Sequence, residues 1–209
     1  MKRDLEKDEN LPKSSVARTS ALASNSTSTN VRLMGEWKQA QKRQAGTHNG
    51  ADPQSGLSFD FVDEEDCTHW TCKKYYPKND DASEEYKRIR EGLGELGVDC
   101  VEWHLRFSEN YPFTPPRVWL SYPHLESTNV WTRGGVCSQI VSEQTGGGWS
   151  PLLNVNTLMV SVTNTTESYK GTRVKQGKYE PHTERGAMLD FGKIENAHKD
   201  GWSQSKTKS

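Results

Sequence analysis

The stretch "VEWHLRFSENYPFTPPRVWLS", residues 101–121, decides the fold class. In its first seven residues the apolar side chains alternate with Glu102, His104 and Arg106. A period of two residues is typical of a strand with one buried and one wet face, as in antiparallel sheets. The prolines of "YPFTPP" exclude a helix, because proline lacks an amide hydrogen and restricts the residue before it. "RVWLS", residues 117–121, is therefore predicted to be the next strand.

Upstream of this stretch, "LSFDFV" at 57–62 and "THWTCKKY" at 68–75 predict two earlier strands. Before them, Val31, Met34 and Trp37 recur at helical spacing. Asn30 is placed to cap this first helix and Gly46 to stop it.

Downstream, residues 121–154 show no sustained period, which is unusual inside a compact domain unless the segment is functional. Two helices are predicted after it. The first carries an apolar stripe, with Asn154 or Asn156 as its cap, and the second has apolar residues spaced for packing. The two stripes are Val155, Leu158, Met159, Val162 and Met188, Phe191, Ile194, Ala197. The order predicts an α+β fold with an N-terminal helix, a four-stranded antiparallel meander sheet, a long irregular segment and C-terminal helices.

Composition indicates that the packed domain begins at about residue 31. Only 32% of the 209 residues are hydrophobic, and residues 1–30 are charged and then Ser/Thr-rich, which predicts a disordered tail, with a second tail at 203–209. No apolar run approaches the roughly 18 residues of a membrane span, and no apolar segment of a secretory signal follows the first residues. We therefore expect a cytoplasmic or nuclear protein. With 27 basic and 28 acidic residues, no net field favours nucleic acid or an acidic membrane as partner.

"RGGVCSQIV", residues 133–141, raises the question of what Cys137 does. In a reducing compartment the four cysteines are expected to be thiols rather than two disulfides. A mixed cysteine/histidine zinc site is conceivable, because Cys67, His69 and Cys72 lie close together and Cys100 and His104 share a strand face, but the paired C-x2-C spacing is missing. A papain-like protease site has His124 and His182 available but needs a helix starting at the thiol, and no periodic helix begins there.

Burial as a small hydrophobe is the common fate of such a cysteine. Against it, Gly134 and Gly135 let a partner's backbone approach, and the segment lacks the period of a core element. These residues favour an accessible thiol in a shallow groove. On these grounds alone, nucleophile and buried thiol stay equally open.

Three motifs in order carry a resemblance: "YPFTPPRVWL" at 111–120, "GGVC" at 134–137 and "GWSPLLNVNTLMVSV" at 148–162. They resemble the core of the ubiquitin-conjugating enzymes, and the likeness covers residues 31 to about 202. The double glycine and the stretch from "KGTRVKQGKYEPH" to "IENAHKDGW" look closest to the Q-type subgroup, which has an extra C-terminal helix.

The resemblance implies that Cys137 accepts ubiquitin, or a ubiquitin-like modifier, as a thioester from an activating enzyme and passes it to a substrate lysine or a ligase. A thiol suits both steps as nucleophile and as leaving group, and no cofactor or metal is implied. Phe113, Ser150 and Pro151 match the surface that the family presents to RING or U-box ligases, and Arg32 and Lys38 lie where it meets activating enzymes and ligases. Trp149 and Tyr111 are expected to hold the two loops on the core.

The sequence also departs from the family. His-Pro-Asn usually precedes the cysteine, whereas Asn129 here follows Ser127 and Thr128. Asn129 is either a donor to a developing oxyanion or a turn former. The triple glycine of "SEQTGGGWS", residues 142–150, lengthens the segment after Cys137. These departures leave an alternative, a catalytically inactive adaptor that keeps the fold and binds ubiquitin or a ligase.

Overall fold

A four-stranded antiparallel sheet forms the centre of the computed structural model, which describes residues 27–45, 47, 50–137 and 148–205. The strands lie in the order β1-β2-β3-β4, as the predicted meander requires, and Trp103 of β3 pairs with Cys72 of β2 and Leu120 of β4. Their bounds are β1 Leu57–Phe61, β2 His69–Tyr75, β3 Cys100–Arg106 and β4 Arg117–Tyr122.

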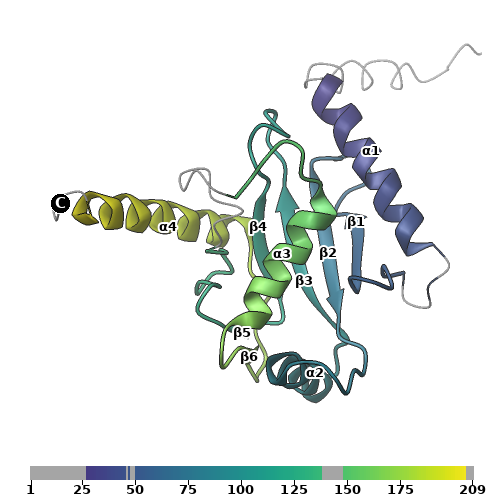
Figure 1. Ribbon diagram of the computed structural model, residues 1–209, viewed down its shortest axis with the longest axis vertical. Coiled ribbons are helices and arrows are strands. Elements are labelled where there is room, and N and C mark those ends of the chain that lie inside the picture. The colour runs from purple at the N-terminus through teal and green to yellow at the C-terminus, as the bar shows by residue number, and fades with distance from the viewer. Residues whose placement is uncertain (1–26, 46, 48–49, 138–147, 206–209) are drawn as a thin grey trace, which may run out of the picture.

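One face of the sheet carries the core, and helix α3 (Val155–Ser168) crosses that face (Figure 1). The predicted alternation along β3 is confirmed, because Trp103 and Leu105 are completely buried in the same core as Leu158 and Met159 of α3. The Asn154 side chain accepts a hydrogen bond from the Thr157 amide at 2.9 Å, so Asn154 is the cap of α3.

The other face of the sheet carries a polar network. His69 Nε2 lies 3.0 Å from His104 Nδ1, and His104 Nε2 lies 3.2 Å from Glu102 Oε1. Arg106 forms ion pairs with Asp66 at 2.6 Å and with Glu184 of α4 at 3.2 Å. The start of α4 (Glu184–Ser205) is thereby bound to β3 on the face opposite α3.

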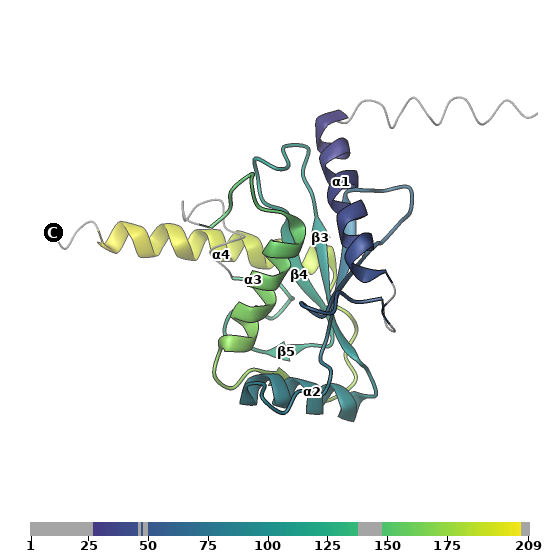
Figure 2. The ribbon, with the colours of Figure 1, turned by 45° about the vertical axis from the view of Figure 1, so that its right-hand side comes forward.

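Helix α1 (Thr27–Gln44) lies along the β1 edge of the sheet (Figure 1 and Figure 2). Trp37 of this helix stacks on Phe61 with ring centroids 4.1 Å apart. The helix begins before the predicted cap, and Asn30 lies inside it. Of the three apolar residues that recur at helical spacing, Trp37 packs against the core, but Val31 is 69% and Met34 37% exposed, and Leu33 is buried instead. The buried face includes a charged residue, Glu36, which an apolar period cannot reveal.

Helix α2 (Glu84–Leu96) was not predicted. Ser83 caps it by accepting a hydrogen bond from the Tyr86 amide at 3.1 Å, and Gly97 ends it in the left-handed conformation. Ile89 and Leu93, one helical turn apart, are its buried apolar residues and are the signal that sequence reasoning missed. The helix contacts β6 of a second ladder, formed by β5 (Leu125–Glu126) and β6 (Arg173–Val174).

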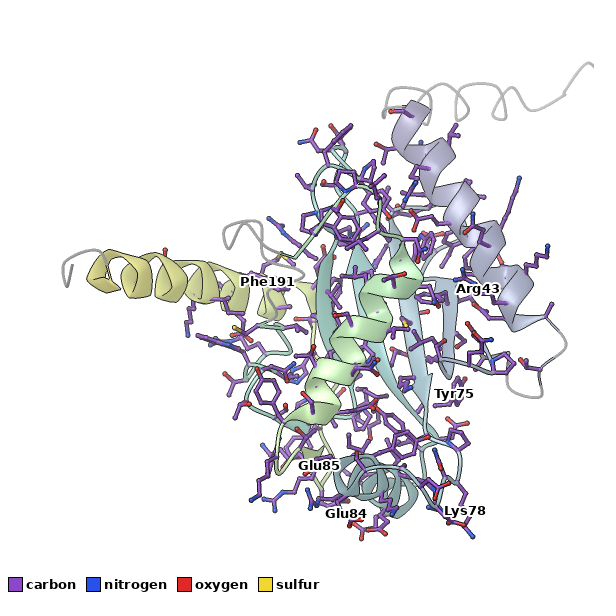
Figure 3. The ribbon with its side chains drawn as sticks, viewed as in Figure 1. Arg43, Tyr75, Lys78, Glu84, Glu85 and Phe191 are labelled. Carbon is purple, nitrogen blue, oxygen red and sulfur yellow. The ribbon has the colours of Figure 1, made fainter. Side chains whose placement is uncertain are left out.

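Helix α4 runs away from the rest of the fold, and Phe191 lies near the end of α4 that adjoins the sheet (Figure 3). Its buried residues are Ala187, Asp190 and Ile194, whereas the predicted Met188 and Phe191 are only partly buried. The side chain of Ala197 lies outside the described residues, as do residues 1–26 and 206–209 of the predicted tails 1–30 and 203–209. The remaining residues of these tails, 27–30 and 203–205, belong to α1 and α4. Within the described ranges, no helix combines the length and apolar character that crossing a membrane requires.

Candidate active site

Residues 129–137 form a tight turn, which we call the cysteine hairpin. Its two sides meet in a bridge between Val130 and Val136, and the Cys137 amide donates to the Asn129 carbonyl at 2.7 Å. At its tip, the Trp131 amide donates to the Gly135 carbonyl at 2.8 Å. These bonds place the thiol-bearing residue at the last rung of a short ladder, directly opposite Asn129.

The cysteine hairpin is also attached to β4. The Leu120 amide donates to the Gly134 carbonyl at 2.9 Å, and Trp119 and Gly135 form a bridge. Through these contacts, part of the predicted irregular segment joins the edge of the central sheet. The backbone that leads to Cys137 is therefore continuous with the sheet.

The two glycines before Cys137 are required by the chain's own packing. Gly134 has φ +89°, and a Cβ there would lie 2.3 Å from the Leu120 carbonyl oxygen. A Cβ on Gly135 would lie 2.5 Å from the Cβ of Asp190 in α4. We expected the glycines to admit a partner's backbone, and this expectation was wrong: β4 and α4 occupy the space.

Cys137 is partly buried. Burial raises the pKa of its thiol, and a hydrogen bond with the Trp131 side chain opposes this shift. At neutral pH the thiol form predominates, so an acyl transfer through Cys137 requires loss of the thiol proton. None of the four cysteines, all within the described ranges, is in a disulfide.

Asn129 is buried, and both ends of its amide are bound within the fold. Its Oδ1 accepts from the Ser127 hydroxyl at 2.7 Å, and its Nδ2 donates to Thr166 Oγ1 of α3 at 3.0 Å. The side chain thus ties the cysteine hairpin to α3. A catalytic role for Asn129 as an oxyanion donor stays a prediction.

Two loops beside the start of α3 are held together by aromatic residues. Trp149 Nε1 donates to the Pro112 carbonyl at 2.7 Å, and its ring centroid lies 5.9 Å from that of the buried Tyr111. These contacts agree with the structural role expected of Trp149 and Tyr111, which is to hold the two loops in place. Between them the loops present apolar side chains to solvent, since Phe113 is 78% and Leu152 is 92% exposed.

The predicted ligase-binding residues therefore lie on adjoining loops. Pro151 is exposed and Ser150 partly so, next to Leu152. Sequence reasoning missed Leu152, although a leucine directly after Ser-Pro in a loop was the signal for it.

Glu36 of α1 is a buried carboxylate with three donors, and sequence reasoning missed it as well. Its Oε1 accepts from Tyr111 Oη at 2.7 Å and from Arg32 Nε at 2.5 Å. Its Oε2 accepts from the Val155 amide, the first of α3, at 2.7 Å. Burial and the bond to Glu36 raise the pKa of Tyr111. One carboxylate therefore joins α1, the proline-rich loop and α3.

Arg32 and Lys38, the predicted residues of the partner-binding helix, differ in their surroundings. Arg32 is bound to Glu36, and its Nη2 donates to the Leu153 carbonyl at 3.0 Å. Lys38 is exposed on the surface of α1. Among the described residues, no three or more His, Cys, Asp or Glu side chains are grouped so that they could hold a metal ion.

Two stacked imidazoles adjoin the cysteine hairpin. The His182 ring lies parallel to that of His124 with centroids 3.7 Å apart, and the His182 side chain is 3.0 Å from where a Cβ on Gly134 would be. The His182 amide donates to the Ser121 carbonyl at 2.9 Å, which fixes this segment beside β4. Burial, with a contribution from His124, lowers the pKa of His182 to about 4.

This pKa predicts a pH-dependent stability. The unfolded chain protonates His182 near its ordinary pKa of 6.5, whereas the native chain does so only near pH 4. The stabilisation from the neutral ring is complete above about pH 6.5 and is lost as the pH falls toward 4. We expect urea unfolding to show a larger loss of stability from about pH 7 to about pH 5 for the wild type than for His182→Gln. Equal losses would contradict the assignment.

A family model described as "Ubiquitin-conjugating enzyme" matches residues 99–176, a range that includes Cys137. The ubiquitin-conjugating enzyme E2 Q-like protein CG4502 of Drosophila melanogaster is 27% identical over 112 residues, 53% of this chain and 36% of that protein. The human ubiquitin-conjugating enzyme E2 Q-like protein 1 is 25% identical over 103 residues, 49% of this chain and 58% of that protein. The chain thus matches only part of the length of these curated relatives.

Among solved structures, a ubiquitin-conjugating enzyme E2 from Plasmodium falciparum is similar over 80% of this chain and 97% of its own, with a TM-score of 0.48 and 17% identity.

Proposed function

We propose that the chain is a member of the ubiquitin-conjugating enzyme family, whose model matches residues 99–176, and that it accepts ubiquitin as a thioester on Cys137 and transfers it to a substrate lysine or to a ligase. The main support for this proposal is the position of Cys137. It lies inside the range matched by the family model and at the end of a hairpin that is joined to both β4 and α3. Similarity to the Drosophila and human Q-like proteins supports a Q-like type.

The proposed chemistry consists of two acyl transfers. The Cys137 thiolate attacks the thioester carbonyl that links the ubiquitin C-terminus to the activating enzyme's cysteine. A new S–C bond forms, the old one breaks, and the activating enzyme's cysteine leaves as a thiolate that takes up a proton. A lysine amine then attacks the new thioester and loses its proton, and Cys137 leaves as thiolate. The chain needs no ATP site or cofactor of its own for either step.

The ligase surface in this proposal is the pair of adjoining loops with Phe113, Ser150, Pro151 and Leu152. Exposed apolar side chains at two loop tips, held by the Trp149–Pro112 hydrogen bond, are suited to burial against a partner. Lys38 is the better candidate for contact with an activating enzyme, because the Arg32 guanidinium is bound to Glu36 and to the Leu153 carbonyl.

A charging assay tests the proposal. The protein is incubated with ubiquitin, activating enzyme and ATP, and wild type is compared with Cys137→Ser on reducing and non-reducing gels. We expect a thiol-sensitive adduct on the wild type, and on Cys137→Ser either a thiol-resistant ester or no adduct. Cys100→Ser is the matched control, since Cys100 is a partly buried cysteine at the start of β3, and it should charge normally.

The alternative is a binding adaptor that keeps the fold without charging. It is favoured by the burial that raises the pKa of the Cys137 thiol, which disfavours the attacking thiolate. Absence of an adduct with ubiquitin and with each ubiquitin-like modifier, each supplied with its own activating enzyme, would favour the adaptor over the enzyme.

A further inference from the structure

Asp190 of α4 reaches into the cysteine hairpin. Its Oδ2 accepts hydrogen bonds from the Arg133 amide at 2.8 Å and from the Gly135 amide at 3.3 Å. Its Oδ1 lies 3.6 Å from Arg133 Nη1. A single carboxylate therefore bridges two alternate amides of the turn that leads to Cys137.

The side chain of Asp190 is completely buried, and in the described part of the chain its Oδ1 has no hydrogen-bond donor. Removing a carboxylate from water is unfavourable unless the group is paired and hydrogen-bonded. The two turn amides and the Arg133 guanidinium supply that compensation. Arg133 is largely exposed, so the backbone amides are the more important partners.

The hairpin is shaped to admit this carboxylate. Gly135 leaves the space in which the Asp190 Cβ lies, since any Cβ at position 135 would be 2.5 Å from it. The Gly135 carbonyl meanwhile accepts from the Trp131 amide, and the next rung of the ladder leads to Val136 and Cys137. The Gly135 amide and carbonyl are thus both fixed, one by Asp190 and the other by the hairpin itself.

We propose that Asp190 is a positioning residue for Cys137, through which α4 fixes the conformation of the cysteine hairpin. This inference rests on the proposed function, in which Cys137 is the nucleophile. Without the carboxylate the Arg133 and Gly135 amides lose their acceptor, the tip of the hairpin rearranges, and the thiol is no longer held in line with an incoming carbonyl. A misplacement of about 1 Å in a reacting group lowers a rate by about 100-fold.

Three variants test the proposal. Asp190→Ala removes the acceptor, whereas Asp190→Asn keeps one oxygen for the two amides and loses only the charge. Leu189→Ala is the matched control, because Leu189 is the neighbouring residue of α4 and is exposed. Single-turnover charging is measured against the concentration of ubiquitin-loaded activating enzyme, and amide hydrogen exchange is measured on the same proteins.

For Asp190→Ala we expect the saturating charging rate to fall by about 10- to 100-fold, with an unchanged concentration for half-maximal rate. Exchange should accelerate at the Arg133 and Gly135 amides, while the Trp103 amide of β3 stays protected. Asp190→Asn should charge close to the wild-type rate, and Leu189→Ala should equal the wild type. Normal charging of Asp190→Asn would show that the hairpin needs the hydrogen-bond acceptor of Asp190 and not its negative charge.

Two results would overturn the proposal: an Asp190→Ala variant that charges like the wild type, or one whose exchange accelerates equally at Trp103 and in the hairpin, which would indicate general destabilisation. If the wild type itself does not charge, the proposed function fails. The positioning role is then judged from the exchange data and from the rate at which iodoacetamide alkylates Cys137, neither of which needs ubiquitin. Unchanged alkylation and exchange in Asp190→Ala would reject it.

Discussion

We expect Gly134→Ala to lower the free energy of unfolding by roughly 2–6 kcal/mol and to slow charging of Cys137. Two effects add. A positive φ is strained for alanine, at about 1–3 kcal/mol, and a Cβ forced against packed atoms adds about 1–3 kcal/mol. At Gly134 the φ is +89° and the obstructing atom is the Leu120 carbonyl oxygen at 2.3 Å. Backbone cannot yield as a side chain can, so the bond between the Leu120 amide and the Gly134 carbonyl is expected to break.

Gly171→Ala is the matched control for this prediction. Gly171 has φ +88°, almost the same as Gly134, but a Cβ there would meet no atom within 4 Å. It should show only the backbone strain, about 1–3 kcal/mol, with normal charging. Urea unfolding of both variants measures the difference. If the two variants lost equal stability, the close approach to Leu120 would not matter.

We expect Glu36→Ala to lower the free energy of unfolding by roughly 3–6 kcal/mol. A net hydrogen bond to a charged group contributes about 1.5–3 kcal/mol, and Glu36 accepts two buried ones, from Tyr111 Oη and from the Val155 amide. The bond from Arg32 adds little, because the Arg32 side chain is partly exposed. Unfolding followed in urea at neutral pH measures the loss.

Glu36→Gln should lose about half as much, since its amide oxygen can still accept from one of the two buried donors while its nitrogen cannot accept. Glu91→Ala, at an exposed glutamate inside α2, is the control and should stay within about 0.5 kcal/mol of the wild type. A Glu36→Ala variant as stable as Glu91→Ala would mean that the carboxylate does not hold α1 and α3 together.

The sheet and α3 could be predicted because their residues obey a period. Trp103 and Leu105 alternate with His104 and Arg106 along β3. As the alternation predicts, the first two are buried in the core and the other two are only partly buried. Leu158 and Met159 lie on the buried stripe of α3 for the same reason. Helix α1 was also placed by a period, but only Trp37 of the three residues packs against the core, and the buried Glu36 is held by hydrogen bonds that a scale of apolar residues cannot represent.

The surroundings of Cys137 could be predicted only in part. The motif singled out the thiol and the loops around Phe113 and Trp149, but it gave a wrong reason for the two glycines. What fills the space beside Gly135 is Asp190, 55 residues further along the chain, and no local pattern connects the two. Asp190 lies three residues after Ala187 and four before Ile194, so it is on the same buried face of α4. An aspartate in line with these apolar residues was a signal of the contact.

The bond from the Arg133 amide to Asp190 spans 57 positions, and this distance has a consequence for synthesis of the chain. At about 5–20 residues per second, a ribosome needs roughly 3–11 s to add that many residues. During this interval the Arg133 and Gly135 amides have no Asp190 carboxylate to bind. The cysteine hairpin can therefore gain all of its contacts only after the start of α4 has been synthesised.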